Sequence, residues 1–206
     1  MKMTDNQHSS RLRGPSEHGV RDQIVEAATG HFGCYGYEKT TVSNLARSIG
    51  FSKAYIYRFF HSKQAIGEVI CANRLADVMG AVDAAVLGAS TASDKLSALF
   101  YGLEAAGNDL FFHDRKLYDV AAVAARERWP SIVRHEECLR ELVTHIILAG
   151  REAGEFERKT PLDEVVSGIY LVMQPYINPV LLQYNQQVAQ EGAGHLSELI
   201  LRSLIP

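Results

Sequence analysis

Residues 40–63 read TTVSNLARSIGFSKAYIYRFFHSK and form the most informative stretch of the 206-residue chain. Small and branched apolar residues recur there at the spacing of one helix face, at Val42, Leu45, Ala46 and Ile49. Gly50 then interrupts this pattern, and glycine tolerates the positive φ that a tight turn requires. Ser52 is a suitable N-cap for the helix that follows, and Ser62 for a long helix after that one. The stretch therefore predicts two short helices joined by a tight turn.

The two predicted helices have the features needed to cross closely and leave one face free. Ala46 is small enough to let the backbones approach each other. Ile56 and Phe59 are three residues apart and can face inward, whereas Lys53 and Tyr57 are four apart on another face. A helix with this division can rest on its partner and present polar groups to a DNA groove.

The distribution of charge also favours a polyanionic partner. No acidic residue occurs between Glu38 and Glu68, a window that contains Lys39, Arg47, Lys53, Arg58 and Lys63. Residues 1–65 carry a net charge of +4 and residues 66–206 a net charge of −7, although the whole chain is only at −3. A basic module on an acidic body suits a DNA-binding protein better than a metabolic enzyme. A chance fluctuation of charge is the alternative.

The same stretch resembles the signature of the tetracycline-repressor (TetR) family. The resemblance covers about residues 20–67, roughly a quarter of the chain, and rests on fixed spacings. These are Thr-Thr at 40–41, Leu-Ala at 45–46, Ile-Gly-Phe-Ser at 49–52, Tyr-Ile-Tyr-Arg-Phe at 55–59 and Ser-Lys at 62–63. Ala54-Tyr55 replaces the common Gly-Thr, so a base preference cannot be transferred. Gln64 replaces the usual Glu.

The resemblance implies that Thr41, Tyr57 and Lys63 bind phosphates and that a recognition helix presents residues 52–55. The residues themselves add Thr40, beside free N–H groups at a helix start, and Arg58. The predicted DNA-contacting set is Thr40, Thr41, Ser52, Lys53, Ala54, Tyr55, Tyr57, Arg58 and Lys63. A solvated charge is the alternative for Arg58. Arg11 and Arg13 could enter a minor groove, with a solvated tail as the alternative.

Helical periodicity continues through the rest of the chain, and strand signals are scarce. We expect an all-α protein of about nine helices, with an N-terminal three-helix helix-turn-helix domain and a C-terminal helical domain. The predicted divisions are a disordered tail at 1–16, a DNA-binding domain at 17–65, and an effector-binding and dimerisation domain at 66–206. Pro175 predicts a kink or an early helix end, and residues 192–194 (Gly-Ala-Gly) a possible interruption of the last helix.

In members of the TetR family the C-terminal domain forms the dimer and binds a small effector. Two apolar stripes, with small Ser167 and Gly168 beside one of them, could supply two helices per protomer to a four-helix interface. The predicted interface residues are Leu162, Val165, Val166, Ile169, Leu196, Leu199, Ile200 and Leu204. The alternative is that these stripes form ordinary core within one chain.

Aromatic residues concentrate in the predicted C-terminal domain, with few charges among them. They could line an apolar pocket for a hydrophobic or aromatic effector of unknown identity. The predicted effector-binding residues are Phe100, Tyr101, Phe111, Phe112, Tyr118, Trp129, Met173 and Tyr176. The alternative for each is a plain core position.

Four residues of metal-ligating types share one face of a predicted helix, namely His135, Cys138, Glu141 and His145. One straight helix brings only i, i+3 or i, i+4 pairs to a single ion, so further ligands, such as His113, would have to come from elsewhere. A partly solvated helix face is the alternative, and we predict neither a metal site nor a cofactor.

The sequence contains no HExxH, GxSxG, phosphate-loop or dinucleotide motif, so we do not expect an enzyme. It also lacks a signal-peptide pattern and an apolar run that could span a membrane. Cys34, Cys71 and Cys138 are most consistent with buried free thiols. The prediction is a cytoplasmic, nucleoid-associated homodimer that binds double-stranded operator DNA, represses neighbouring genes and responds to a small effector. The alternative is a helical small-molecule binder or enzyme with a vestigial DNA module.

Overall fold

The computed structural model describes residues 17–113 and 115–206, although the side chains of 110–116 and 183–191 are not described. The described residues form helices and no strands, which confirms the all-α prediction. The helices are α1 (Glu17–Tyr35), α2 (Val42–Ser48), α3 (Lys53–Tyr57), α4 (Lys63–Leu87), α5 (Ala92–His113), α6 (Arg115–Arg126), α7 (Pro130–Ala153), α8 (Leu162–Ile177) and α9 (Pro179–Ser203). The predicted disordered tail, with Arg11 and Arg13, lies outside the described residues.

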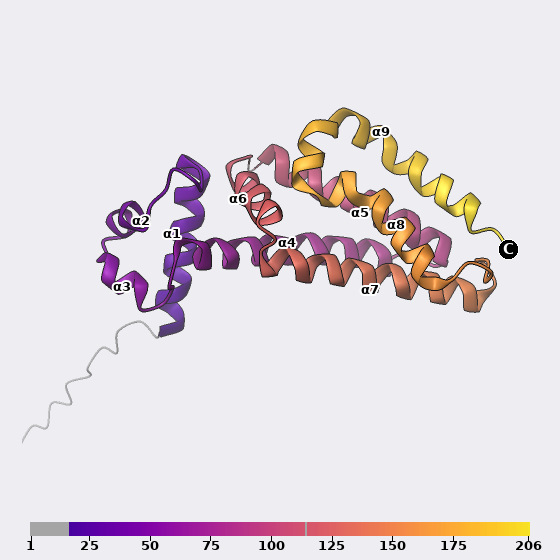
Figure 1. Ribbon diagram of the computed structural model, residues 1–206, viewed down its shortest axis with the longest axis horizontal. Coiled ribbons are helices and arrows are strands. Elements are labelled where there is room, and N and C mark those ends of the chain that lie inside the picture. The colour runs from indigo at the N-terminus through magenta and orange to yellow at the C-terminus, as the bar shows by residue number, and fades with distance from the viewer. Residues whose placement is uncertain (1–16, 114) are drawn as a thin grey trace, which may run out of the picture.

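The molecule is elongated, with a small helical unit at one end and a larger helical body at the other (Figure 1). Helices α1, α2 and α3 form the small unit, and the long α4 runs from it into the body, where α7 lies alongside. Helices α5, α8 and α9 complete the body, and α6 packs against α1. There are two apolar clusters, one centred on α1–α3 and one in the body. Helix α6 and the start of α7 contribute to the first cluster, so the small unit is buttressed by the body.

Three hydroxyl side chains begin the helices at the N-terminal end. The N–H of Asn44 donates to Thr41 Oγ1 at 3.1 Å, which caps α2. Ser52 caps α3 and Ser62 caps α4 in the same manner, each accepting from the N–H three residues later. Gly50 adopts a φ of +72° in the turn between α2 and α3, a conformation that a side chain would strain. The predicted caps at Ser52 and Ser62 are therefore confirmed.

Two helix ends differ from the sequence expectation. Helix α3 ends at Tyr57, so Phe59 and Phe60 follow the helix and pack from the connection to α4. Helix α8 continues past Pro175 and ends at Ile177, so of the two alternatives at Pro175 the early end does not occur. Pro175 has no N–H to donate to the carbonyl four residues earlier, and the helix continues for only two residues beyond it.

Helix α9 is continuous through Gly192 and Gly194, so the interruption expected there is also wrong. A Cβ atom on Gly194 would lie 2.7 Å from the hydroxyl oxygen of Tyr101, and one on Gly192 would lie 3.0 Å from that of Tyr176. The two glycines therefore permit close packing of α9 on α5 and α8. They do not mark a turn.

The turn between α7 and α8 depends on a glycine packed against an aromatic ring. A Cβ atom on Gly150 would overlap Cδ2 of Phe156, whose side chain is buried. We expect Gly150→Ala to lower the free energy of unfolding by about 2 kcal/mol, since the ring must leave its site. Urea unfolding measures this change. Gly30→Ala is the matched control, because nothing lies near its Cβ position, and it should be neutral or stabilising.

Candidate DNA interface and effector cavity

Helix α3 presents a polar face to solvent. Ser52, Lys53 and Ala54 are exposed, and Tyr57 retains 43% of its surface. The Lys53 ammonium lies 5.7 Å from the centre of the Tyr57 ring, so both groups occupy the same side of the helix. Ile56 lies on the opposite side and is fully buried. The predicted division of α3 into an inner and an outer face is therefore confirmed.

Tyr55 occupies an intermediate position. Its ring is half-buried and packs edge-on between Phe51, at a centroid distance of 5.0 Å, and Phe59, at 5.4 Å. The guanidinium of Arg58 lies 5.5 Å from the centre of the same ring and remains exposed. Phe51 precedes α3 and Phe59 follows it, so the rings packed around Tyr55 support α3 from both of its ends.

The two threonines before α2 point in different directions. Thr41 is exposed and caps the helix, so its hydroxyl lies at the surface. Thr40 is buried, and its hydroxyl donates a 2.8 Å hydrogen bond to the carbonyl of Gly36. It also lies 3.1 Å from Nδ1 of His31. In this conformation the hydroxyl of Thr40 is engaged within the protein and fixes the loop between α1 and α2.

Lys63, at the start of α4, is held by the same loop. Its ammonium donates a 2.9 Å hydrogen bond to the backbone carbonyl of Tyr37 and lies 4.2 Å from the centre of the Tyr37 ring. Partial burial lowers the pKa of Lys63, while the carboxylates of Glu38 and Glu127 oppose this shift. Lys63 thus links the start of α4 to the α1–α2 loop.

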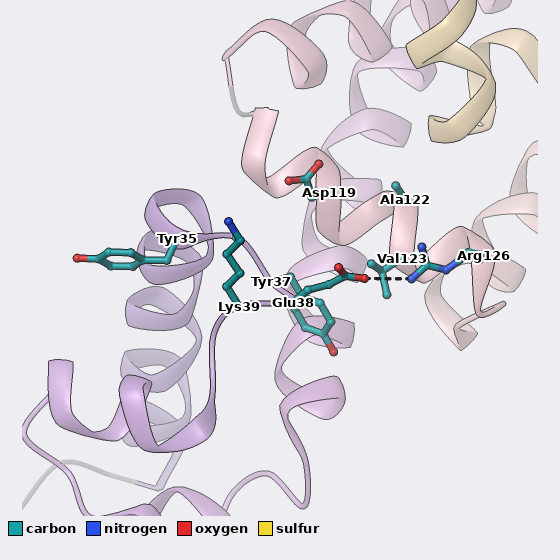
Figure 2. A pocket seen from close by; sticks show the side chains of 9 residues that line it. Tyr35, Tyr37, Glu38, Lys39, Asp119, Ala122, Val123 and Arg126 are labelled. Atoms are coloured by element: carbon teal, nitrogen blue, oxygen red, sulfur yellow. Dashed lines mark hydrogen bonds and ion pairs between the residues drawn. The ribbon is translucent and has the colours of Figure 1, made fainter.

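The small unit and the body meet at a junction that sequence reasoning did not identify. Arg126 on α6 donates to Glu38 at 3.3 Å beside a cavity of about 400 Å³ (Figure 2). Trp129 packs edge-on against Tyr37 at a centroid distance of 5.5 Å, and both rings crowd Gly67 of α4. Trp129, which the sequence grouped with the effector aromatics, thus belongs to the cluster of the small unit.

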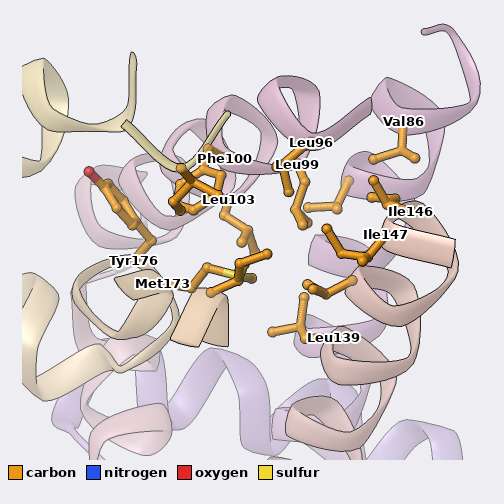
Figure 3. Packing of buried hydrophobic residues seen from close by; sticks show 14 of the residues in the cluster. Val86, Leu96, Leu99, Phe100, Leu103, Leu139, Ile146, Ile147, Met173 and Tyr176 are labelled. Atoms are coloured by element: carbon orange, nitrogen blue, oxygen red, sulfur yellow. The ribbon is translucent and has the colours of Figure 1, made fainter. Parts of the chain in front are cut away.

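Other predicted effector residues lie in the core of the body (Figure 3). Phe100, Tyr118, Met173 and Tyr176 are all buried there, and Phe100 meets Tyr176 edge-on at 6.2 Å. Tyr101 is instead 53% exposed. The side chains of Phe111 and Phe112 lie outside the described residues.

Three cavities in the described part of the body meet at His135, which the sequence placed on a possible metal-binding face. One of them, of about 190 Å³, lies between α7 and α8. A small inner cavity of about 40 Å³ lies among α4, α5, α6, α7, α8 and α9, and includes Tyr118 and Tyr176 in its lining. An outer groove of about 420 Å³ runs between α4 and α7. His135 is 7% exposed and lines both the inner cavity and the outer groove. The structure therefore places His135, which was not among the predicted effector residues, beside Tyr118 and Tyr176, which were.

Most residues predicted for the dimer interface contribute to the protomer's own core. Five of them are buried in the body cluster, namely Val165, Val166, Ile169, Ile200 and Leu204. Leu162 and Leu196 are partly buried against that cluster, whereas Leu199 is 63% exposed. Leu171 on α8, which the sequence analysis did not single out, is 69% exposed. The apolar surface of α8 and α9 is therefore divided between core and solvent.

In the part of the chain that the structure describes, no group of three or more His, Cys, Asp or Glu residues is arranged to hold a metal ion. His135 is buried, whereas Cys138, Glu141 and His145 are exposed, and the side chain of His113 is outside the described residues. Cys34 and Cys138 are exposed and Cys71 is buried, so the prediction of buried thiols is right only for Cys71. Across residues 17–113 and 115–206, no helix has the length and apolar character of a membrane span.

Two family models match the chain. One, described as bacterial regulatory proteins of the tetR family, matches residues 24–69, and the other, a tetracyclin repressor-like C-terminal domain, matches residues 92–193. No curated protein matches the sequence. The helix-turn-helix unit and helical body define a DNA-binding transcriptional regulator with a C-terminal ligand-binding domain. The chain belongs to the TetR family, whose members are transcription factors and not enzymes.

Solved structures share the fold at low sequence identity. The fatty acid degradation regulator FadR from Bacillus halodurans is 19% identical, with a TM-score of 0.67 over 93% of this chain and 97% of its own. FadR from Bacillus subtilis, solved in complex with stearoyl-CoA, is 19% identical, with a TM-score of 0.62 over 89% and 97%. The TetR family regulator PfmR from Thermus thermophilus is 26% identical, with a TM-score of 0.56 over 88% and 95%.

Proposed function

We propose that this regulator represses neighbouring genes by binding a palindromic operator as a homodimer, and that a small hydrophobic effector releases it. The observation that carries this proposal is the exposed face of α3, where Lys53 and Tyr57 lie side by side. A lysine in the first turn of a helix opposes the helix dipole, so it costs some tenths of a kcal/mol unless an anion is bound. Its position suits a helix whose N-terminal residues enter the major groove.

The proposed DNA surface surrounds this helix. Lys53, Ala54 and Tyr55 approach base edges, while Thr41, Ser52, Tyr57 and Arg58 approach phosphates and sugars. Thr40 and Lys63 support the surface through the α1–α2 loop, and the partly exposed ammonium of Lys63 retains a donor that can reach a phosphate. Phosphate contacts fix the position of the domain, and base contacts near Lys53 provide sequence preference.

A two-fold dimer would present two such helices to two half-sites about 34–36 Å apart or somewhat further. The proposed interface is the outer face of α8 and α9, where Leu171 and Leu199 are 69% and 63% exposed. On α8, Ser167 and Gly168 are also exposed, and no atom lies within 4 Å of a Cβ position on Gly168. A partner helix can approach closely there, and the buried residues of both helices hold this face in place.

Introducing negative charge into the proposed interface tests whether α8 and α9 form the dimer. We expect Leu171→Asp with Leu199→Asp to convert the dimer to a monomer, because each carboxylate would be desolvated in an apolar contact. Light scattering coupled to gel filtration measures the mass. The matched control is Leu87→Asp, since Leu87 is 82% exposed at the end of α4. A dimer that survives the double substitution unchanged would place the interface elsewhere.

Release by the effector requires a connection between the body and the DNA-binding unit. The pair Glu38–Arg126 and the Tyr37–Trp129 contact provide one, through α6 and the start of α7. An effector that prefers a domain arrangement unable to span both half-sites would shift the population away from DNA. The stearoyl-CoA held by the similar FadR from Bacillus subtilis supports an effector with a long apolar portion.

A gel-shift assay with the DNA upstream of the protein's own gene tests the proposal. We expect a complex that contains one dimer per operator and weakens steeply as salt is raised, because bound cations replace counterions on the phosphates. An equal affinity for the upstream fragment and for shuffled DNA of the same composition would contradict specific repression. Increased transcription from the upstream promoter in the presence of the protein would contradict the repressor assignment.

A further inference from the structure

The side chain of His135 lies in the body with a ring nitrogen that no described residue satisfies. It is 7% exposed, and no residue in the described part of the chain forms a hydrogen bond with its Nδ1. Buried polar groups nearly always have a partner, and leaving one unsatisfied costs about 1–3 kcal/mol. The unsatisfied nitrogen therefore points to a bound water or ligand group that the described residues do not supply.

His135 lies where three cavities approach one another, and the third, of about 190 Å³, includes Arg128 and Glu136, which form an ion pair. Together with Leu75 of α4, it lines both the outer groove between α4 and α7 and the small inner cavity of the body. The groove, at about 420 Å³, falls within the range of small-molecule sites. Its wall includes Ala72, Ala76 and Met79 from α4, so most of it is apolar. The pair Leu75–His135 thus forms a partition between a solvent-facing groove and an apolar interior.

The surroundings of His135 favour a ligand without charge. Burial lowers the pKa of His135 to about 4, so the imidazole is neutral near neutral pH and offers one donor and one acceptor. The groove contains one cation, Arg134, and one anion, Asp83, which leaves no excess charge to balance an ionised head group. A carboxylate beside the neutral imidazole would lose hydration there without meeting a charged ring.

We propose that His135 recognises an uncharged carbonyl or hydroxyl oxygen on an elongated apolar molecule that enters through the groove between α4 and α7. The apolar portion lies along Ala72, Ala76 and Met79 of the groove, and its end reaches past Leu75 toward the small inner cavity beside Tyr118 and Tyr176. This inference rests on the proposed effector function and specifies the chemistry of the ligand and the residue that selects it.

The test uses full-length, DNA-free protein, and 2-decanone as the probe. Titration calorimetry gives its affinity, and nitrogen NMR of histidine-labelled protein reports on the His135 ring, whose signals are those missing from His135→Gln. We expect 2-decanone to bind and to shift the His135 signals. Decanoate, which has the same chain length and an ionised head, should bind about tenfold more weakly or not at all.

Two substitutions separate hydrogen bonding from packing. His135→Phe retains an aromatic ring and should weaken 2-decanone binding about tenfold, the usual effect of losing one buried hydrogen bond. His135→Gln keeps a donor and should retain most of the affinity. His145→Phe is the matched control, since His145 is exposed on the same helix and should leave binding unchanged.

Three outcomes would overturn the inference. They are tighter binding of decanoate than of 2-decanone, equal binding to wild type and His135→Phe, and the absence of any shift of the His135 signals. The last would indicate that the cavity holds only water. Because these measurements contain no DNA, their failure leaves the operator-binding proposal standing, and a failed gel shift leaves them interpretable.

Discussion

Replacing Lys53 by glutamate is expected to lower the affinity of this regulator for its operator about a hundredfold. The substitution removes a cation from the first turn of α3 and places a carboxylate against the phosphates or base edges. A contact of this kind contributes about 1–3 kcal/mol, and the new repulsion adds to the loss. Fluorescence anisotropy with a labelled operator duplex, at one fixed salt concentration, measures the effect.

The fold should tolerate the substitution, because the Lys53 side chain is exposed and contacts the ring of Tyr57 on the same side of α3. A glutamate also suits the N-terminus of a helix, so thermal stability should stay equal or rise slightly. Lys159→Glu is the matched control, with the same charge change on the exposed turn between α7 and α8. Equal losses in the two variants would mean that only net charge matters and that α3 is not the reading element.

Acid is expected to destabilise the protein through His135. Burial lowers the pKa of this imidazole from 6.5 to about 4. Between about pH 4 and pH 6.5 the unfolded chain therefore binds a proton at His135 that the folded protein does not bind. The contribution of His135 to stability is fully present above about pH 6.5 and is lost as the pH falls toward about 4. Between about pH 7 and about pH 4.5, the free energy of unfolding should fall by about 2.5 kcal/mol from this group alone.

The comparison of wild type with His135→Phe isolates that contribution. Urea unfolding at both pH values, at one protein concentration, gives the two differences. Carboxylates such as Glu155, whose pKa is lowered by the N–H groups of Ala92 and Ser93, add to the acid loss equally in both proteins. His145→Phe, on the exposed side of α7, should behave as wild type. An identical acid loss in all three proteins would show that the ring of His135 is not held in a buried, neutral form.

The small DNA-binding unit was accessible from sequence because its determinants are local. Apolar spacing, a glycine in the turn and serine caps each act over three or four residues, and the structure confirms them at Gly50, Ser52 and Ser62. The inward direction of Thr40 was not accessible, since it depends on the carbonyl of Gly36 and on His31 across the loop. Local pattern gives the helices, and non-local contacts give the direction of individual side chains.

The body shows the same limit over longer distances. The stripe of Val165, Val166 and Ile169 correctly indicates burial, but periodicity does not reveal whether the covering surface belongs to the same chain. The ion pair between Glu38 and Arg126 joins residues 88 positions apart, so no local signal could indicate it. His135 was noted for metal-ligating chemistry, whereas its environment is set by Leu75 on another helix.

Selection of double-stranded DNA from a random-sequence library by the purified full-length protein tests whether α3 reads a palindromic operator. Wild type should enrich an inverted repeat with half-site centres about one helical turn apart or somewhat further, and Lys53→Glu should enrich no such repeat. Failure of the wild type to enrich any sequence, or enrichment of the same repeat by both proteins to the same degree, would contradict this role of α3.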